Sequence, residues 1–420
     1  MGILIVLLYM VSLYVRPQDW VPFFLDWPTN DILIPIGLVT GYMAYAKDRE
    51  NFRIPQLKLF VFYLAIIFVS TLLATDGSTA MEQLILFTKR VLVFIMVLFN
   101  INSLGRLNAA IGWTLLLSLF LAYQAYLQAT VGHSWGGMTP YPGYSEIRVR
   151  WYGDWDGPNV YGILFVIATA MSMELIFGRH AFLSRLSGLA LSLAYLTAIF
   201  FTNSRGAVLA VACAILFYFK DRFKNVIALS IGGLAVLLLF TLGPSRLQQV
   251  SSGESSAHER TWLWEQGLAM LKEHPLLGVG RGEFIHNVDL GLIAHNNFVQ
   301  NFAETGLLGF FCFVAVLWFT FKGNLLVSES EDIVGNRYSS KGRMMNAALV
   351  GYAAATFFVV MELDLFYFVL GLSSATYVVT ARENPSLPRL EFTRRDLYIV
   401  LGAMVGIIFM VWLAAVKEIL

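Results

Sequence analysis

Residues 186–204 read LSGLALSLAYLTAIFFTNS, a run of 19 uncharged residues between Arg185 and Arg205. A helix of about 20 apolar residues is long enough to cross the hydrocarbon core of a bilayer. Backbone polar groups in lipid must satisfy one another, so a span is either a helix or a strand of a closed barrel. A barrel strand would show about ten residues of alternating polarity. The run is longer and continuous, so it predicts a transmembrane helix.

Similar runs recur along the whole chain. Lys224 to Arg246 brackets 21 uncharged residues, and Asp396 to Lys417 brackets 20. Further apolar runs lie at 59–75, 91–105, 157–173, 305–321, 344–361 and 365–381, a long uncharged stretch begins at 107, and shorter segments lie at 1–15, 32–46 and 206–219. The first run lacks a basic leader and a small-residue cleavage site, so we expect a retained helix rather than a cleaved signal peptide. These runs predict one integral membrane domain over 1–420, an all-α, polytopic bundle of 12 or 13 transmembrane helices.

The composition excludes other classes of protein. Of the 420 residues, 57% are hydrophobic and 14% are charged, whereas an average globular protein has roughly 25% charged residues. A water-soluble enzyme and a disordered chain are both excluded, the latter because apolar residues abound. The net charge of +1 gives no basic field for nucleic acid. Cys213 and Cys312 lie in apolar runs without metal-ligand spacing.

The loops between the predicted spans differ in their content of Lys and Arg. One alternate set of loops holds 18 of the 29 basic residues, and the positive-inside rule places this set in the cytoplasm. The opposite face, periplasmic in a bacterium, carries longer polar segments at 16–30, 131–157 and 243–296. The segment 243–296 is predicted to be a large periplasmic loop. It contains a helix from Ser256 to about His274, which a capping box begins and a proline ends.

Basic residues on this outer face lie at the edges of the spans. Arg205 lies between two apolar runs, and Arg260 lies near the start of the loop helix, where its charge opposes the helix dipole. Lys89 and Arg90 begin another apolar run. Cations that converge from different helices would suit a diphosphate, because arginine binds phosphate oxygens bidentately. The alternative is that these side chains anchor helix ends at lipid headgroups or form surface ion pairs.

Two further groups on this face suggest substrate contacts. The segment 131–157 is rich in Trp, Tyr and Gly and contains Asp154 and Asp156, which would suit sugar rings and their hydroxyls. The alternative is an interfacial aromatic belt. His295 lies where the loop meets the next span, and an imidazole, with a pKa of roughly 6.5, suits a general base. The alternative is a histidine bonded to backbone at a helix start. Gly278-Val-Gly280 reads as a flexible turn, weak as a phosphate loop.

Several short stretches together resemble the O-antigen ligase and polymerase superfamily. They are Arg150–Gly153 with Gly157-Pro158-Asn159, Asn203-Ser204-Arg205-Gly206, Arg260-Thr261-Trp262, Gly278-Val279-Gly280, Ala294-His295-Asn296 and Glu304-Thr-Gly306-Leu-Leu-Gly309. Arg16-Pro17-Gln18 is similar to a subgroup of that superfamily. The resemblance implies an inverting glycosyltransferase of the GT-C type in the bacterial inner membrane, with its active site facing the periplasm. It implies no cofactor and no metal.

The resemblance also implies substrates and roles for residues. The donor would be an undecaprenyl-diphosphate-linked glycan, and the acceptor would be lipid A-core, as in lipopolysaccharide biosynthesis, with membrane lipids as further partners. His295 would be the base, and Arg205 and Arg260 would hold the diphosphate. Further substrate-binding candidates are Lys89, Arg90, Arg150, Asn296, Asp154 and Asp156. A polymerase, a protein O-oligosaccharyltransferase and a transporter of lipid-linked sugars remain alternatives.

Overall fold

The computed structural model describes the chain except for residues 26, 48, 50, 51, 75, 144, 145, 221–254, 361 and 417–420. Over the described residues the chain forms helices and connecting turns, and no β-strand. The α-helices are α1 (Gly2–Tyr14), α2 (Thr29–Lys47), α3 (Pro55–Leu73), α4 (Gly77–Asn100), α5 (Leu104–Val131), α6 (Pro158–Phe177), α7 (Phe182–Thr202), α8 (Arg205–Phe219), α11 (Ser255–Glu273), α12 (Asn297–Glu329), α13 (Glu331–Val334), α14 (Asn336–Ala355), α15 (Asp364–Glu383) and α16 (Arg394–Val416).

Every predicted span within the described residues overlaps a helix, although the span at 91–105 covers the end of α4 and the start of α5, and the span at 344–361 extends beyond the end of α14. Seven of the described helices are long and apolar enough to cross a membrane: α3, α5, α6, α7, α12, α15 and α16. Two shorter apolar helices, α1 and α8, also match predicted spans. The run from Lys224 to Arg246 lies outside the described residues, so the total of 12 or 13 stays a prediction. The chain is a multi-pass membrane protein built as an all-α bundle, as the sequence predicted.

The helix ends follow from local sequence. Asp76 caps α4, because its carboxylate accepts hydrogen bonds from the backbone of Ser78 and Thr79. Prolines begin α3 and α6, where a missing backbone N–H costs nothing. Gly132, with φ of 89°, ends α5 in the left-handed conformation that glycine adopts readily.

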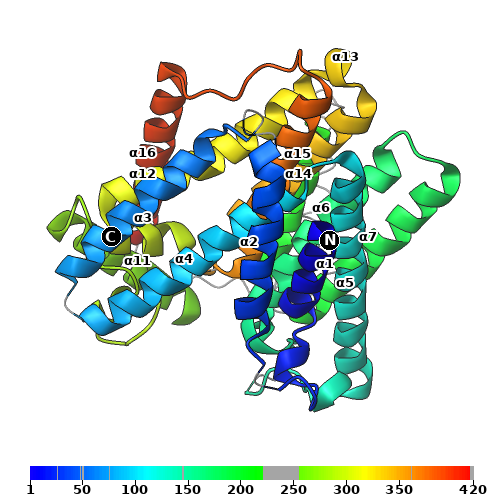
Figure 1. The fold of residues 1–420 in the computed structure, drawn as a ribbon. Helices are drawn as coiled ribbons and strands as arrows, with labels where there is room; N and C mark the ends of the chain where they lie inside the picture. Colours follow the sequence, from blue (N-terminus) through cyan, green and yellow to red (C-terminus); the bar gives the residue numbers. More distant parts are fainter. Residues whose placement is uncertain are drawn as a thin grey trace.

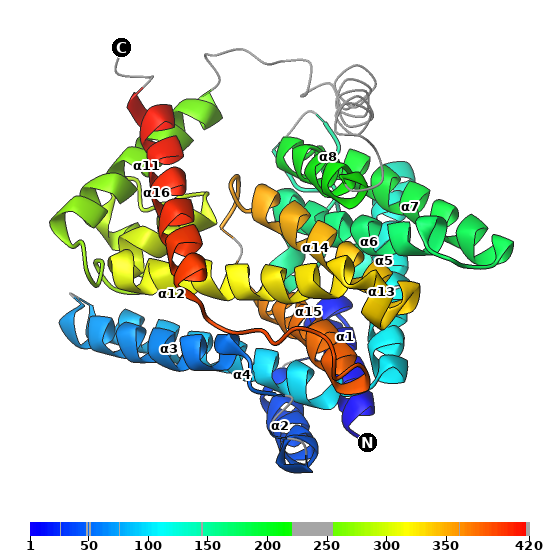
Figure 2. The same ribbon diagram turned by 90° about the horizontal axis from the view of Figure 1, so that it is seen from above.

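The bundle is packed around α6 and α15. In α6, which packs against α5, α7, α8 and α14, 78% of the most apolar window is buried; in α15 the share is 89%. Helices α1, α2 and α5 stand upright in Figure 1, while α3, α4 and α12 run obliquely beside them. Seen from above in Figure 2, α16 crosses α12, and α11 lies next to both. Only 17% of the apolar window of α16 is buried, so that helix lies at the periphery.

Candidate active site

A cavity of about 450 Å³ lies where five segments of the chain meet. The segments are 141–163, 203–207, 259–260, 293–295 and 355–360. Arg205, Arg260 and His295 all line this cavity, although they are far apart in the sequence. A volume of this order is typical of a small-molecule site, for which about 300–1,000 Å³ is usual.

The corner between α7 and α8 presents Arg205 to the cavity. Asn203 ends α7 with a φ of 55°, and Ser204 caps α8 by accepting a hydrogen bond of 3.3 Å from the backbone of Ala207. Arg205 is the first residue of α8. The N-terminus of a helix carries partial positive charge, so the helix and the guanidinium favour an anion at the same place.

His295 adopts a left-handed backbone conformation, with φ of 50°. Non-glycine residues occupy this region uncommonly, and they persist there only when neighbours hold them. The indole of Trp264 donates to the carbonyl of Ala294 at 3.1 Å, and the amide of Ala294 donates to the side chain of Gln300 at 2.9 Å. On the other side, the amide of Asn297 donates to a backbone carbonyl of the loop after α14 at 2.8 Å. These bonds fix the backbone on both sides of the imidazole.

The predicted loop helix is confirmed as α11 and carries Arg260. It begins at Ser255, one residue earlier than predicted, so Arg260 lies in its second turn rather than its first. Trp264 follows one turn later and therefore lies on the same face of the helix. Because Trp264 is bonded to the residue before His295, Arg260 and His295 come to line the same cavity.

The charges around His295 favour its neutral form. Partial burial lowers the pKa of the imidazole, the Arg260 charge lowers the pKa further, and Glu259 acts in the opposite direction. A histidine with a lowered pKa is neutral at pH 7 and can accept a proton.

Arg148 was missed as a site residue, and Arg150 was named in its place. Arg148 is buried, lines the cavity and donates to the side chain of Asn159 at 3.1 Å. Arg150 is not among the residues that line the cavity. It pairs with Asp156 at 2.7 Å and lies 5.3 Å from the ring centre of Tyr141. The sequence shows a pair of arginines at 148 and 150, but it does not show which of the two lines the cavity.

The cavity lining is positively charged. The described residues that line it include three arginines, Arg148, Arg205 and Arg260, and one carboxylate, that of Glu259. In the described part of the chain, no group of three or more His, Cys, Asp or Glu side chains is placed to hold a metal ion. The arginines are the cations that the lining offers to an anionic ligand.

The side chain of Asn296 caps a helix and does not line the cavity. It is fully buried, and its side-chain oxygen accepts hydrogen bonds from the amides of Phe298 at 2.9 Å and Val299 at 3.3 Å, which caps α12. It is not among the residues that line the cavity. Asn296 therefore supports the loop that carries His295.

Lys89, Arg90 and Asp154 line a second cavity, of about 320 Å³. Asp156 is exposed, pairs with Arg150 and lines neither cavity. The structure thus places six of the predicted site residues in two groups, while Arg150, Asn296 and Asp156 line neither cavity. One group surrounds His295, and the other lies near the N-terminal segment.

The Gly278-Val279-Gly280 turn forms backbone hydrogen bonds with α12, and it lines neither of the two cavities. The helix α12 breaks at Gly306, where φ is 63°. The backbone before and after this break bonds to residues 275–280: the amide of Val279 donates to the carbonyl of Ala303 at 3.0 Å, and the amide of Leu307 donates to the carbonyl of Pro275 at 2.8 Å. A Cβ atom on Gly278 or Gly306 would collide with the facing backbone. The glycines of the two motifs therefore allow the backbone of 275–280 to pack directly against the backbone of 303–308. We call this contact the seam.

Comparison with known proteins finds matches in the part of the chain that carries these residues. Residues 190–314 match the family model described as O-antigen ligase, and this segment contains Arg205, Arg260 and His295. The exopolysaccharide production protein ExoQ of Rhizobium meliloti (strain 1021) is 34% identical over 118 residues, which cover 24% of this chain and 27% of the relative. The matched region is thus about a quarter of that relative. These matches support the resemblance to the O-antigen ligase superfamily over this part of the chain.

Proposed function

We propose that this protein is an inverting glycosyltransferase that takes a glycan from an undecaprenyl diphosphate carrier and transfers it to an acceptor hydroxyl. The observation that carries the proposal is the convergence of Arg148, Arg205, Arg260 and His295 on one cavity. Three arginines suit the two phosphates of such a donor. A neutral imidazole beside them suits the activation of an alcohol.

The reaction is a single displacement. The acceptor oxygen attacks the anomeric carbon of the donor sugar, and the bond from that carbon to the diphosphate oxygen breaks. His295 accepts the proton of the acceptor hydroxyl. The leaving diphosphate gains negative charge as its bond breaks, and Arg205 and Arg260 stabilise that charge. Attack from the side opposite the diphosphate inverts the anomeric configuration.

We propose lipid A-core as the acceptor, so that the protein acts as an O-antigen ligase in lipopolysaccharide biosynthesis. It would lie in the bacterial inner membrane with the cavity open to the periplasm, consistent with the distribution of Lys and Arg among the loops. A second candidate is a polymerase that extends another lipid-linked glycan. The name of the relative, an exopolysaccharide production protein, favours this candidate.

The test is a transfer assay with two acceptors. Purified protein receives the lipid-linked glycan together with either lipid A-core or a second glycan chain, and the products are separated by size. The substitution His295→Asn removes the base but keeps a residue that tolerates left-handed φ. We expect transfer to lipid A-core by the wild type and loss of transfer in His295→Asn. Elongated lipid-linked glycan instead would identify a polymerase.

The same assay tests the chemical roles. Full transfer by a folded His295→Asn protein would exclude His295 as the base. Full transfer in excess chelator is expected, because arginine charges are proposed to stabilise the leaving group. Loss of transfer that magnesium restores would contradict metal independence.

A further inference from the structure

The second cavity is lined mainly by segments near the N-terminus. The residues that line it include Arg16, Gln18, Thr29, Asn30 and Asp31, from the segment between α1 and α2 and the start of α2. The polar lining is completed by Lys89 and Arg90 of α4, by Asp154 and by Asp364. None of these residues lines the cavity around His295.

The two cavities are neighbours because they share two segments of chain. One segment contributes Asp154 to the second cavity and, three residues later, Gly157 to the first. The other contributes Val360 to the first cavity and Leu363 to the second. At these two places the Cα atoms that line the two cavities are therefore at most about 11 Å apart.

The charges of the second cavity are paired. The ammonium of Lys89 lies 2.6 Å from the carboxylate of Asp31. The guanidinium of Arg16 lies 2.9 Å from the carboxylate of Asp154. Arg90 completes the set with Asp364, at 3.8 Å. The lining described thus holds three cations and three carboxylates, whereas the first cavity holds three arginines and one carboxylate.

This pairing suits a neutral, polyhydroxylated ligand better than a diphosphate. A sugar hydroxyl both donates and accepts hydrogen bonds, so it is matched by a lining that offers ammonium and guanidinium donors next to carboxylate acceptors. A diphosphate needs a surplus of positive charge. Trp27, which is 49% exposed, adds an aromatic surface at the edge of the cavity. A sugar ring can pack its apolar face on such a surface.

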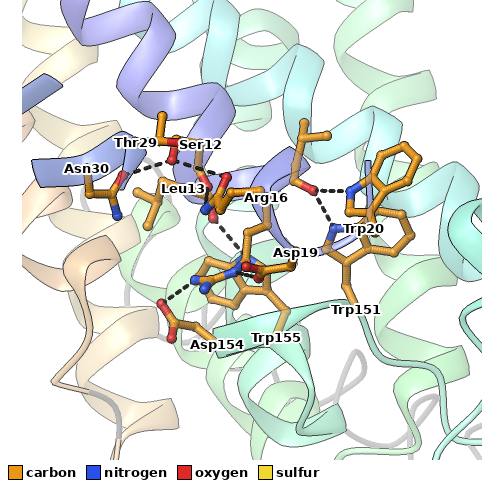
Figure 3. A network of polar contacts seen from close by, with 12 residues as sticks. Ser12, Leu13, Arg16, Asp19, Trp20, Thr29, Asn30, Trp151, Asp154 and Trp155 are labelled. Atoms are coloured by element: carbon orange, nitrogen blue, oxygen red, sulfur yellow. Dashed lines mark hydrogen bonds and ion pairs between the residues drawn. The ribbon is translucent and has the colours of Figure 1, made fainter. Parts of the chain in front are cut away.

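The cavity wall is fixed in position by hydrogen bonds. Figure 3 shows Arg16 between Asp19 and Asp154, to both of which it is paired. In the same network the indoles of Trp20 and Trp151 both donate to the carbonyl of Val15, at 2.9 Å each. A polar lining held this firmly is preorganised, which reduces the entropic cost of binding.

We propose that the second cavity is a carbohydrate subsite that holds a neutral sugar of the acceptor beside the transfer centre. The proposal rests on the proposed glycosyl transfer, and it gives Lys89, Arg90 and Asp154 a role in acceptor recognition rather than in diphosphate binding. Trp27 would pack on the ring, and Asp154 and Lys89 would bond to hydroxyls.

Binding by the purified full-length protein tests the subsite without requiring transfer. The probes are neutral oligosaccharides of one to four sugars, prepared from the host's surface glycan without lipid or phosphate, and inorganic pyrophosphate. Trp27→Ala and Asp154→Asn are compared with Asp156→Asn, an exposed residue outside both cavities. We expect Trp27→Ala and Asp154→Asn each to weaken oligosaccharide binding tenfold or more and to leave pyrophosphate binding unchanged. Asp156→Asn should change neither.

Kinetics separate the acceptor from the donor. In the transfer assay, Trp27→Ala should raise the KM for the acceptor with little change in kcat. A rise in donor KM with an unchanged acceptor KM would overturn the assignment to the acceptor. Absence of oligosaccharide binding to the wild type, or equal binding by wild type and both variants, would overturn the subsite itself. Failure of the proposed function would appear separately, as absence of glycan transfer by the wild type to either acceptor.

Discussion

The substitution Trp264→Phe tests whether the hydrogen bond from Trp264 helps to hold the backbone of His295 in its left-handed conformation. The indole of Trp264 is buried, with 7% of the residue exposed, and it donates to the carbonyl of Ala294 at 3.1 Å. Phenylalanine keeps an aromatic ring at this position but lacks the donor. A hydrogen bond of this kind contributes about 1 kcal/mol net. A residue held in a sparsely populated backbone region costs on the order of 1–3 kcal/mol. The bond therefore offsets a substantial part of the strain at His295, whose φ is 50°.

The expected consequence is a loss of activity rather than of binding. A loss of about 1 kcal/mol corresponds to a roughly fivefold change in the equilibrium constant between protein with the imidazole in place and protein with it displaced, since 1.36 kcal/mol is tenfold. We expect kcat to fall, by up to about fivefold, and the KM for the donor to stay unchanged. The matched control is Trp262→Phe, on the same helix but partly buried and outside this hydrogen bond. If Trp264→Phe lowers kcat no more than Trp262→Phe at equal thermal stability, the positioning argument is wrong.

Three other perturbations have defined outcomes. Glu259→Gln removes the charge that raises the pKa of His295, so the acid limb of kcat/KM should move to lower pH; an upward shift would contradict the electrostatic assignment. Arg148→Gln removes a buried charge from the cavity and should raise the donor KM on the order of tenfold, whereas Arg150→Gln should not; equal effects in steady-state kinetics would refute the inward placement of Arg148. Gly306→Ala places a side chain at a φ of 63° against facing backbone, so it should lower the free energy of unfolding by at least about 1–3 kcal/mol; an unchanged denaturation midpoint would show that the seam is not tight.

The helices could be predicted from the sequence because few backbone structures are stable in the hydrocarbon core of a bilayer. A run such as 186–204 must satisfy its own backbone hydrogen bonds, so its length and lack of charge determine its structure. The loop helix was predicted from a capping pattern and a proline, and α11 confirms it to within one residue at each end. Such local rules do not show where one helix lies relative to another.

The candidate site was predicted only where a residue pattern marks a position. Arg205, Arg260 and His295 were named from their positions at helix edges and from the resemblance, and the structure places all three at one cavity. Lys89 was grouped with them because it was predicted to lie on the same face, but α4 carries it to a second cavity. Asn296 is adjacent to His295 in sequence, yet the cap of α12 turns its side chain inward.

The break at Gly306 separates the start of α12 from its long continuation. A continuous helix transmits a change of tilt along its whole length, because each turn is bonded to the next. Here the backbone before and after Gly306 is bonded across to the 275–280 segment, and the ladder of i to i−4 bonds is interrupted. The two parts of α12 are therefore connected through the 275–280 segment as well as through their own chain.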